Sequence, residues 1–284
     1  MVNQKGFTLV ELMVAIILGA VVAASGITLY LTAQKTYLLQ EGFLSNQNDM
    51  DLAFRKMTDA IHKSSITNKI DPTSRDPETG IVLSATNYGY STTINTKYLS
   101  HSESGMSFVN KGSDQLVIQY TPQVLGGYDC EGRKITNYNK VVERYFVRQS
   151  TLNTQNLVLA CSAGRYSGGA ITGMTDTGQT LIDGIDYFHT LLMVYDQSNN
   201  FRSIKISDYN ALADKPYIVG VQLGVLLHSN KPIGFRGIKD LDSAIPVLDE
   251  NVKLNATVKN SGKKYVYETV TQAVSIRTMT GSVK

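Results

Sequence analysis

The sequence predicts an α+β protein in which a long N-terminal helix packs on a head built from an antiparallel β-sheet. Two observations lead to this fold class. Residues 7–31 are apolar with a single charge, and an apolar helical period continues beyond them to about Lys63. From Ile81 onward the chain instead consists of short apolar segments, one with a clear period of two, separated by turn residues.

The stretch over residues 7–31 is long enough to cross a bilayer. As a helix, at about 1.5 Å per residue, it would measure roughly 37 Å, more than the ~30 Å hydrocarbon core. Glu11 is its only charged residue. Because a carboxylate at membrane depth costs several kcal/mol, we expect Glu11 to have a function. The alternative is an ordinary signal peptide or membrane anchor that tolerates one acid near its end.

The residues that flank this stretch favour cleavage before it. A secretory signal has a basic start, an apolar core of about 7–15 residues and a small-residue cleavage site after that core. Here the apolar stretch is longer, and the Ala-rich residues 20–26 lead into more apolar chain. The small residue Gly6 lies before the stretch. Cleavage there would remove Lys5 and make Glu11 the fifth residue of the mature chain.

The segment GFTLVEL, residues 6–12, resembles the class III signal of type IV pilins and type II secretion pseudopilins. The resemblance implies a pilin-like fold, cleavage by a prepilin peptidase between Gly6 and Phe7, and N-methylation of Phe7. It also implies that Glu11 directs assembly by pairing with the terminal amine of a neighbouring subunit. The physics agrees, since a buried carboxylate needs a partner.

On this basis we expect four segments: a leader peptide over 1–6 that is removed, a transmembrane helix segment over 7–31, an amphipathic periplasmic continuation over 32–63, and a β-rich globular head over 64–284. Lys5 orients the leader to the cytoplasm by the positive-inside rule. The chain is then expected to cross the inner membrane once, with a periplasmic head, before it joins a pilus at the cell surface.

The continuation of the helix has one apolar face. Its members recur at spacings of seven, four, three and four residues: Phe43, Met50, Phe54, Met57 and Ile61. We expect this face to pack against the head. Gly26 is expected to soften the helix near the membrane edge, because Gly is disfavoured in a helix by about 1 kcal/mol relative to Ala.

The clearest strand of the head covers residues 218–227, where Val and Leu alternate with a smaller face that contains two Gly. That small face suggests the close approach of something bulky, for which the long helix is the candidate. Further strands are expected over 115–120, 141–147, 157–161, 187–195, 202–206 and 265–278.

Turns and loops are expected between these strands. Residues 198–200 should form a hairpin turn, and Asp196 beside them lacks the acidic pattern of a calcium loop. The polar segments 162–180 and 231–251 are expected to be exposed loops.

Cys130 and Cys161 are the only cysteines in the sequence. Disulfides persist in the periplasm, so we expect these two residues to form a bridge. No third or fourth ligand motif accompanies them, which argues against a zinc site. Two free buried thiols are the alternative.

Several segments resemble the PilW family of minor pilins, over most of the chain: the helix at 40–65, the Asp-Cys-Glu-Gly turn at 129–132, the strand at 157–161, residues 181–185 with the following Val194-Tyr195, and the strand at 219–228. Residues 61–65 and 275–278 depart from the family pattern. The resemblance implies a structural subunit that helps prime assembly of the type IV pilus, near its tip, with twitching motility, DNA uptake or adhesion as roles.

The partners implied are other minor pilins, the major pilin, the inner membrane and, as processing enzyme, the prepilin peptidase. The main alternative is a J-type minor pseudopilin of a type II secretion system. Such a protein is a relative with the same head plan but usually a shorter chain.

No motif predicts an enzyme, a cofactor or a metal site. The four histidines are far apart in the sequence, and no G-x-S-x-G, H-E-x-x-H or phosphate-binding Gly loop occurs. His189 lies in an apolar strand and is expected to be a satisfied core or edge residue.

A DNA-binding minor pilin is the weaker alternative. The formal charge of +3 leaves no electrostatic footprint for nucleic acid, so direct binding is not expected. Such a protein would use two basic pairs and four tyrosines as stacking rings: Arg133/Lys134, Lys263/Lys264, Tyr128, Tyr138, Tyr145 and Tyr166.

Overall fold

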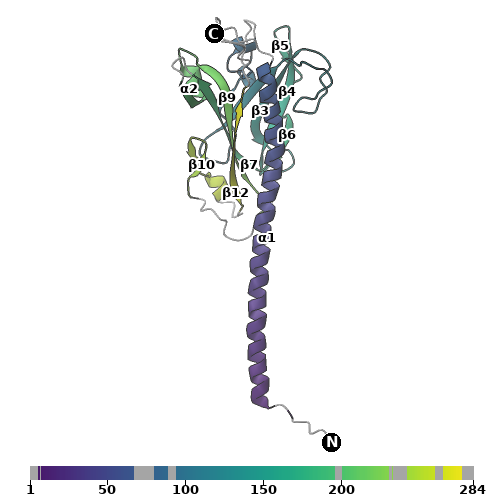
Figure 1. Cartoon of the computed structure of the whole chain (residues 1–284), viewed down its shortest axis with the longest axis vertical. Coiled ribbons are helices and arrows are strands. Elements are labelled where there is room, and N and C mark those ends of the chain that lie inside the picture. The colour runs from purple at the N-terminus through teal and green to yellow at the C-terminus, as the bar shows by residue number, and fades with distance from the viewer. Residues whose placement is uncertain are drawn as a thin grey trace.

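The computed structural model describes residues 6, 8–66, 80–88, 94–195, 200–229, 232, 242–259 and 265–276. Its first element is α1 (Leu9–Ile66), whose first half projects away from the rest of the molecule and whose second half lies along a β-rich head (Figure 1). The predicted α+β class, a long N-terminal helix on antiparallel sheet, is confirmed.

Helix α1 runs without interruption for 58 residues. It passes through Gly26, so the softening expected there does not appear as a break in the helix. Gly26 has no other heavy atom near the position of a Cβ, whereas a Cβ on Gly42 would lie 3.2 Å from Cβ of Ser229. The small residue that matters for packing is therefore Gly42, where the helix approaches the head.

The first sheet of the head has six strands, and every pair in it is antiparallel. Four lie side by side in chain order, and the last two both pair with the fourth: β1 (His101–Gly105), β2 (Ser113–Tyr120), β3 (Lys140–Gln149), β4 (Leu157–Ser167), β5 (Ala170–Thr172) and β6 (Gln179–Asp183). The strands predicted over 115–120, 141–147 and 157–161 are confirmed within β2, β3 and β4.

The second sheet has four antiparallel strands in the order β12 (Tyr267–Ser275), β9 (Tyr217–His228), β7 (Ile185–Tyr195) and β8 (Phe201–Lys205). The predicted strands are confirmed here too, with ends that coincide or differ by up to three residues, and residues 277 and 278 of the last one lie outside the described residues. The pair Tyr195↔Phe201 brings β7 and β8 together as a hairpin would. Asp196, Ser198 and Asn199 lie outside the described residues.

Shorter elements complete the head. A two-stranded hairpin, β10 (Ile245–Val247) with β11 (Glu250–Val252), stands apart from both sheets in its pairing. The helical elements are η1 (Ala85–Tyr88), η2 (Thr96–Tyr98), α2 (Ile206–Ala211) and α3 (Ala256–Lys259).

Side chains of β2 join the two sheets. Strand β8 pairs only with the end of β7 from Leu191 to Tyr195, so the earlier part of β7 has one edge without a partner strand. There the backbone N–H of Phe188 donates to Ser113 Oγ at 3.2 Å, and that of Thr190 donates to Asp114 Oδ2 at 2.7 Å. These bonds satisfy buried backbone donors that the sheet itself leaves unpaired.

The predicted apolar face of α1 packs into the core between these sheets. Met50, Met57 and Ile61 are almost completely buried, and Phe54 nearly so, whereas Phe43 is half-buried. The helix contacts β2, β6 and β12, and its buried residues share one core with both sheets. Each large apolar side chain buried in this way contributes roughly 2 kcal/mol.

The small face of β9 does not meet α1, and this prediction was wrong. A Cβ on Gly224 would lie 2.8 Å from Cγ of Leu248, in the β10–β11 hairpin, and one on Gly220 would collide with Met193 of β7. Val221, Leu223 and Val225, on the other face, share the core with the helix. Because side chains alternate along a strand, the helix packs on the large face and the hairpin on the small one.

The segment 162–180 was predicted as an exposed loop, which is wrong in part. Strand β4 continues through Ala163 and Gly164, which are both buried, to Ser167, and it pairs with β5 and β6. Of the segment 231–251, residues 231 and 233–241 lie outside the described residues, and the remainder includes the β10–β11 hairpin rather than a simple loop.

Replacement of Met57 by Ala should loosen the contact between α1 and the head. The change leaves a cavity at a fully buried position, so we expect the free energy of unfolding to fall by about 2–4 kcal/mol. Denaturant unfolding of the full chain in detergent would measure this. Leu52→Ala is the matched control, since Leu52 lies on the exposed side of the same helix. Equal losses in the two variants would contradict the packing described.

Candidate functional site

The chain before α1 is open at the predicted processing position. Gly6 is exposed, and no other heavy atom lies within 4 Å of where its Cβ would be. The helix begins only at Leu9. Phe7 and Lys5 lie outside the described residues. Gly6 is therefore exposed and precedes the helix. Both features are needed at a peptide bond that a processing enzyme must reach.

Thr8 and Glu11 form a capping box at the start of α1. The Thr8 backbone N–H and hydroxyl donate to Glu11 Oε2 at 3.0 and 2.9 Å, and the Glu11 N–H donates to Thr8 Oγ1 at 3.3 Å. This is the reciprocal pattern of a Thr N-cap with a Glu three residues later, and it satisfies donors that the first turn leaves unpaired. The T-x-x-E spacing could have predicted it from the sequence.

Among the residues that the structure describes, Glu11 has no cationic partner. Its three bonds are all to Thr8 within the same chain. The residues that follow it up to Leu31 are all exposed, and most of them are apolar. Glu11 thus presents an acid at the start of an apolar helix surface, and its charge is not balanced within the described part of the chain.

The first half of α1 exposes its apolar side chains on all sides. Within the described residues one helix is long and apolar enough to span a membrane, and its most apolar window has no buried residue. Soluble proteins rarely expose a continuous apolar surface of this size, so this segment indicates contact with a membrane or with other proteins.

An apolar stripe runs from the end of this segment along the rest of α1, on the side opposite to the buried face. It consists of Tyr30, Tyr37, Leu44 and Leu52, all between 57% and 65% exposed. Their spacings of seven, seven and eight residues keep them on one side of a helix, away from the buried face at Met50 and Met57. We call these four residues the free stripe. Its period suits contact with another helix.

Cys130 and Cys161 are joined by a disulfide, with their Cα atoms 6.1 Å apart. It ties the turn before β3 to β4. Glu143 lies beside it, fully buried, and accepts hydrogen bonds from the Tyr145 and Tyr120 hydroxyls and from the Cys130 N–H, at 2.7, 3.0 and 3.0 Å. Burial raises the pKa of Glu143, against the effect of these bonds. The sulfurs bond each other, so this cluster cannot serve as a metal site.

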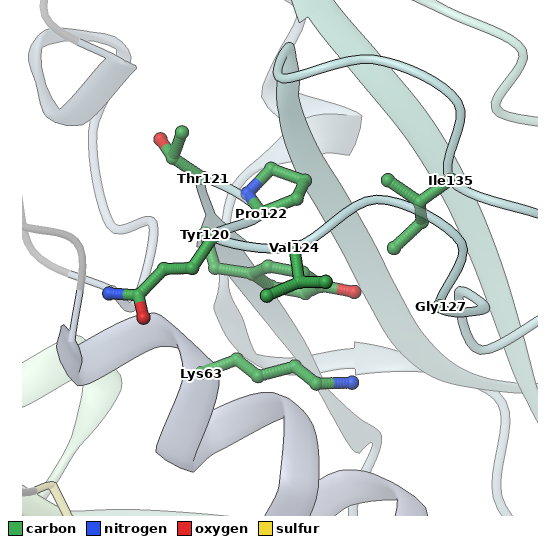
Figure 2. A pocket seen from close by; sticks show the side chains of 8 residues that line it. Lys63, Tyr120, Thr121, Pro122, Val124, Gly127 and Ile135 are labelled. Carbon is green, nitrogen blue, oxygen red and sulfur yellow. The ribbon is translucent and has the colours of Figure 1, made fainter.

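A shallow hollow lies where the end of α1 meets the chain after β2 (Figure 2). Pro122, Val124 and Ile135 line it with apolar groups. Lys63 of α1 places its ammonium 5.6 Å from the centre of the Tyr120 ring. The volume of about 330 Å³ is at the lower end for a small-molecule site. The hollow offers an apolar surface with one cation, and its lining holds no nucleophile–base pair.

The residues proposed for DNA stacking do not form a surface. Tyr145 and Tyr166 are buried in the head, and only Tyr128 and Tyr138 are exposed. Arg133 is held in ion pairs, at 3.3 Å to Asp129 and 2.5 Å to Glu131.

The second basic pair, Lys263 and Lys264, lies outside the described residues. Because half of the stacking rings are buried, the structure weakens the DNA-binding alternative.

Two of the four histidines are buried next to aspartates, which the sequence did not indicate. His189 contacts Asp114 and Asp249, and His228 contacts Asp186. The prediction that His189 is a satisfied core residue is confirmed. The ligand atoms of His189, Asp249 and Glu250 lie within 4.8 Å of one another, although they come from distant parts of the sequence.

Comparison with known proteins finds a family match at the N-terminal end of the chain. Residues 1–27 match the family described as the prokaryotic N-terminal methylation motif. The structure is similar to the type IV-like pilin TTHA1219 from Thermus thermophilus, with a TM-score of 0.38 and 10% identity, over 81% of this chain and 94% of that chain. No curated protein matches the sequence. The chain therefore carries an N-terminal methylation motif.

Replacement of Cys130 by Ser should destabilise the head. The bridge closes a loop of 31 residues, so in the chain-entropy model its loss costs about 3–4 kcal/mol of unfolding free energy. Denaturant unfolding of the full chain without reductant would measure it. Cys161→Ser should lose as much, and the double variant little more, because all three lack the same bridge. A double variant with twice the loss would contradict this account.

Proposed function

We propose that this protein is a type IV pilin-like structural subunit, and specifically a minor pilin of the PilW type. A prepilin peptidase removes residues 1–6 and methylates Phe7. The helix segment 7–31 then holds the chain in the inner membrane with its head, 64–284, in the periplasm. From there it joins other minor pilins and the major pilin, primes assembly and is incorporated near the pilus tip.

The observation that carries this proposal is the order of features at the N-terminus. An accessible Gly6 comes first, then the capped acid Glu11, then an apolar helix with no buried residue in its most apolar window, and residues 1–27 match a methylation motif. A soluble protein would gain nothing from such a helix, because the exposed apolar surface favours aggregation in water. In a membrane the same surface is stable, since every helical backbone bond is made internally.

The free stripe supports assembly through the helix as well as the head. Three of its four residues, Tyr37, Leu44 and Leu52, lie beyond the 7–31 segment, on the side of the helix away from the buried face. Neighbouring subunits whose helices lie side by side would cover it. In this proposal the protein itself only associates with other subunits, and the peptidase carries out the cleavage at Gly6.

A J-type minor pseudopilin of a type II secretion system is the second candidate, since the methylation motif and the exposed helix suit both systems. Deletion of the gene separates them. Loss of surface pili with normal exoprotein secretion supports the minor pilin. Normal piliation with lost secretion supports the pseudopilin. If neither changes, the assembly role is wrong.

Gly6→Val should leave the leader attached. A bulky side chain beside the scissile bond would block the peptidase, whereas Gly places no Cβ there. Mass spectrometry of the membrane fraction should show an intact Met1 terminus in the variant and a methylated Phe7 in the wild type. Gly26→Val serves as the control, because it makes the same change inside the helix and should be processed normally. A wild-type chain that begins at Met1 in piliated cells would refute the proposal.

Glu11→Leu should lower incorporation into pili several-fold without abolishing it. Membrane insertion should be as good or better, since a charge at membrane depth is removed. A partner amine would be left unpaired in a low-dielectric bundle, which costs several kcal/mol. The measurement is the ratio of protein in sheared pili to protein in the inner membrane, at equal processing.

Glu11→Gln is the matched control for the capping box. Gln can fill the same position of a capping box, so this variant keeps the bond to Thr8 and removes only the charge. If the charge directs assembly, Gln should behave like Leu. If Gln behaves like the wild type, Glu11 acts only as a helix cap.

A further inference from the structure

The tip of the β10–β11 hairpin docks on the small face of the second sheet. Leu248 at the tip has a φ of 55°, a left-handed conformation that non-Gly residues rarely adopt. Its side chain lies over Gly224 of β9, where a Cβ would come within 2.8 Å of it. The pair Val247↔Glu250 leaves Leu248 and Asp249 as a two-residue hairpin loop, whose tight turn requires this φ, and the contact with Gly224 seats the turn on the sheet.

His189 of β7 connects this tip to the first sheet. Its ring is 1% exposed. Nδ1 lies 2.8 Å from Asp114 Oδ2 of β2, and Nε2 lies 2.8 Å from Asp249 Oδ1 at the hairpin tip. Both ring nitrogens thus face carboxylate oxygens at hydrogen-bond distance. Only the imidazolium form has an N–H on both nitrogens, so with both carboxylates ionised this geometry requires protonated His189.

Asp114 is held in place independently of His189. Its Oδ1 accepts the Glu103 N–H at 2.8 Å, and its Oδ2 accepts the Thr190 N–H at 2.7 Å. Asp249 is instead 43% exposed in its side chain, and it lies on the short turn of the hairpin. Loss of one proton would therefore leave Asp114 anchored and release Asp249.

The charged groups around His189 come from every element packed against it. Lys205 of β8 pairs with Glu250 and lies 4.0 Å from Asp249, and Lys111 pairs with Glu250 at 2.5 Å and lies 3.6 Å from Glu103.

The Tyr187 ring stacks on His189, with 5.8 Å between ring centres. Among the described residues around His189, the four carboxylates of Glu103, Asp114, Asp249 and Glu250 face two ammonium groups, those of Lys111 and Lys205. The cluster therefore has an excess of negative charge, which the imidazolium form of His189 reduces. Burial lowers the pKa of His189, and the bonds and charges of Asp114 and Asp249 outweigh it, so the net effect raises the pKa.

We propose that His189 is a proton-operated latch that fastens the β10–β11 hairpin to the two sheets. The protonated ring bridges Asp114 and Asp249 and keeps Leu248 seated on Gly224. When the ring loses a proton, one of its two carboxylate bonds is lost and the nitrogen lone pair faces the carboxylate of Asp249. The tip is then released from the sheet.

The sign of the pH dependence follows from the raised pKa. A histidine whose pKa is higher in the folded state contributes its full stabilisation below the unfolded value of about 6.5. That contribution is lost as the pH rises through the folded value. The hairpin tip should therefore be held most firmly below a pH of about 6.5 and should loosen as the pH rises through the raised folded pKa of His189.

A divalent cation is the competing occupant of this place. The ligand atoms of His189, Asp249 and Glu250 lie within 4.8 Å of one another, which is close enough for a cation to be considered. However, Lys205 and Lys111 already engage Glu250. These two ammonium groups would repel a metal cation, so a proton on His189 is favoured over a metal ion at this place.

The latch can be tested on the full chain in detergent micelles with EDTA. Histidine labelled with ¹³C at Cε1 alone gives only four ring signals, and the His189 signal is assigned by its loss in His189→Gln. Hydrogen exchange of the peptide that contains residues 245–252, corrected for the intrinsic effect of pH, reports the hairpin. We expect His189 to titrate above about 6.5 and the hairpin to lose at least tenfold protection across the same range.

Two variants and one addition decide the result. Asp249→Asn removes only the exposed carboxylate, so it should lower the His189 midpoint and shift the hairpin transition with it. His228→Gln, the control for the other buried Asp–His pair, should leave both unchanged. Hairpin protection that does not vary with pH would overturn the proposal. So would Zn²⁺ restoring protection at high pH in the wild type but not in Asp249→Asn.

Discussion

The structure depends on one helix that must be stable in two surroundings. Because α1 makes its backbone hydrogen bonds internally, its first half needs no partner strands in an apolar phase. Its second half reaches the head with one apolar face, and Met57 and Ile61 become part of a core shared with both sheets. Gly42 marks the place where the helix first approaches the head closely. The helix therefore joins the exposed apolar segment to the head as one continuous element.

The two sheets that pack against this helix are not joined by strand pairing. Buried polar side chains of β2 join them instead. Ser113 and Asp114 satisfy the open edge of β7, and Asp114 also fixes His189. Each of these groups is costly to bury unless its bonds are all made. The contact between β2 and the edge of β7 is consequently specific. A shift of β2 by one residue would turn Asp114 to the other face of its strand and leave the backbone donors of β7 unpaired.

Features governed by local period or motif could be predicted from the sequence. The helix, its buried face, the main strands and the Gly6–Glu11 segment belong to this group. The partner of the small face of β9 could not be predicted, because Gly224 shows only that something approaches closely and not which element does. Strands β5 and β6 were missed since they have only three and five residues, too few to show a clear period of two. The His189 contacts join residues 75 and 60 positions apart, which no local pattern reveals.

The capping box and an intersubunit role for Glu11 are compatible because a carboxylate has two oxygens. Both Thr8 bonds go to Oε2, and a carboxylate offers about four acceptor positions in all. Oε1 stays available to a further donor. The bonds to Thr8 also fix the carboxylate toward the N-terminal end of the helix, so a neighbour's amine would meet a preorganised acceptor. The cap would in this way reduce the entropy lost on pairing, and Thr8 would contribute to assembly by positioning Glu11.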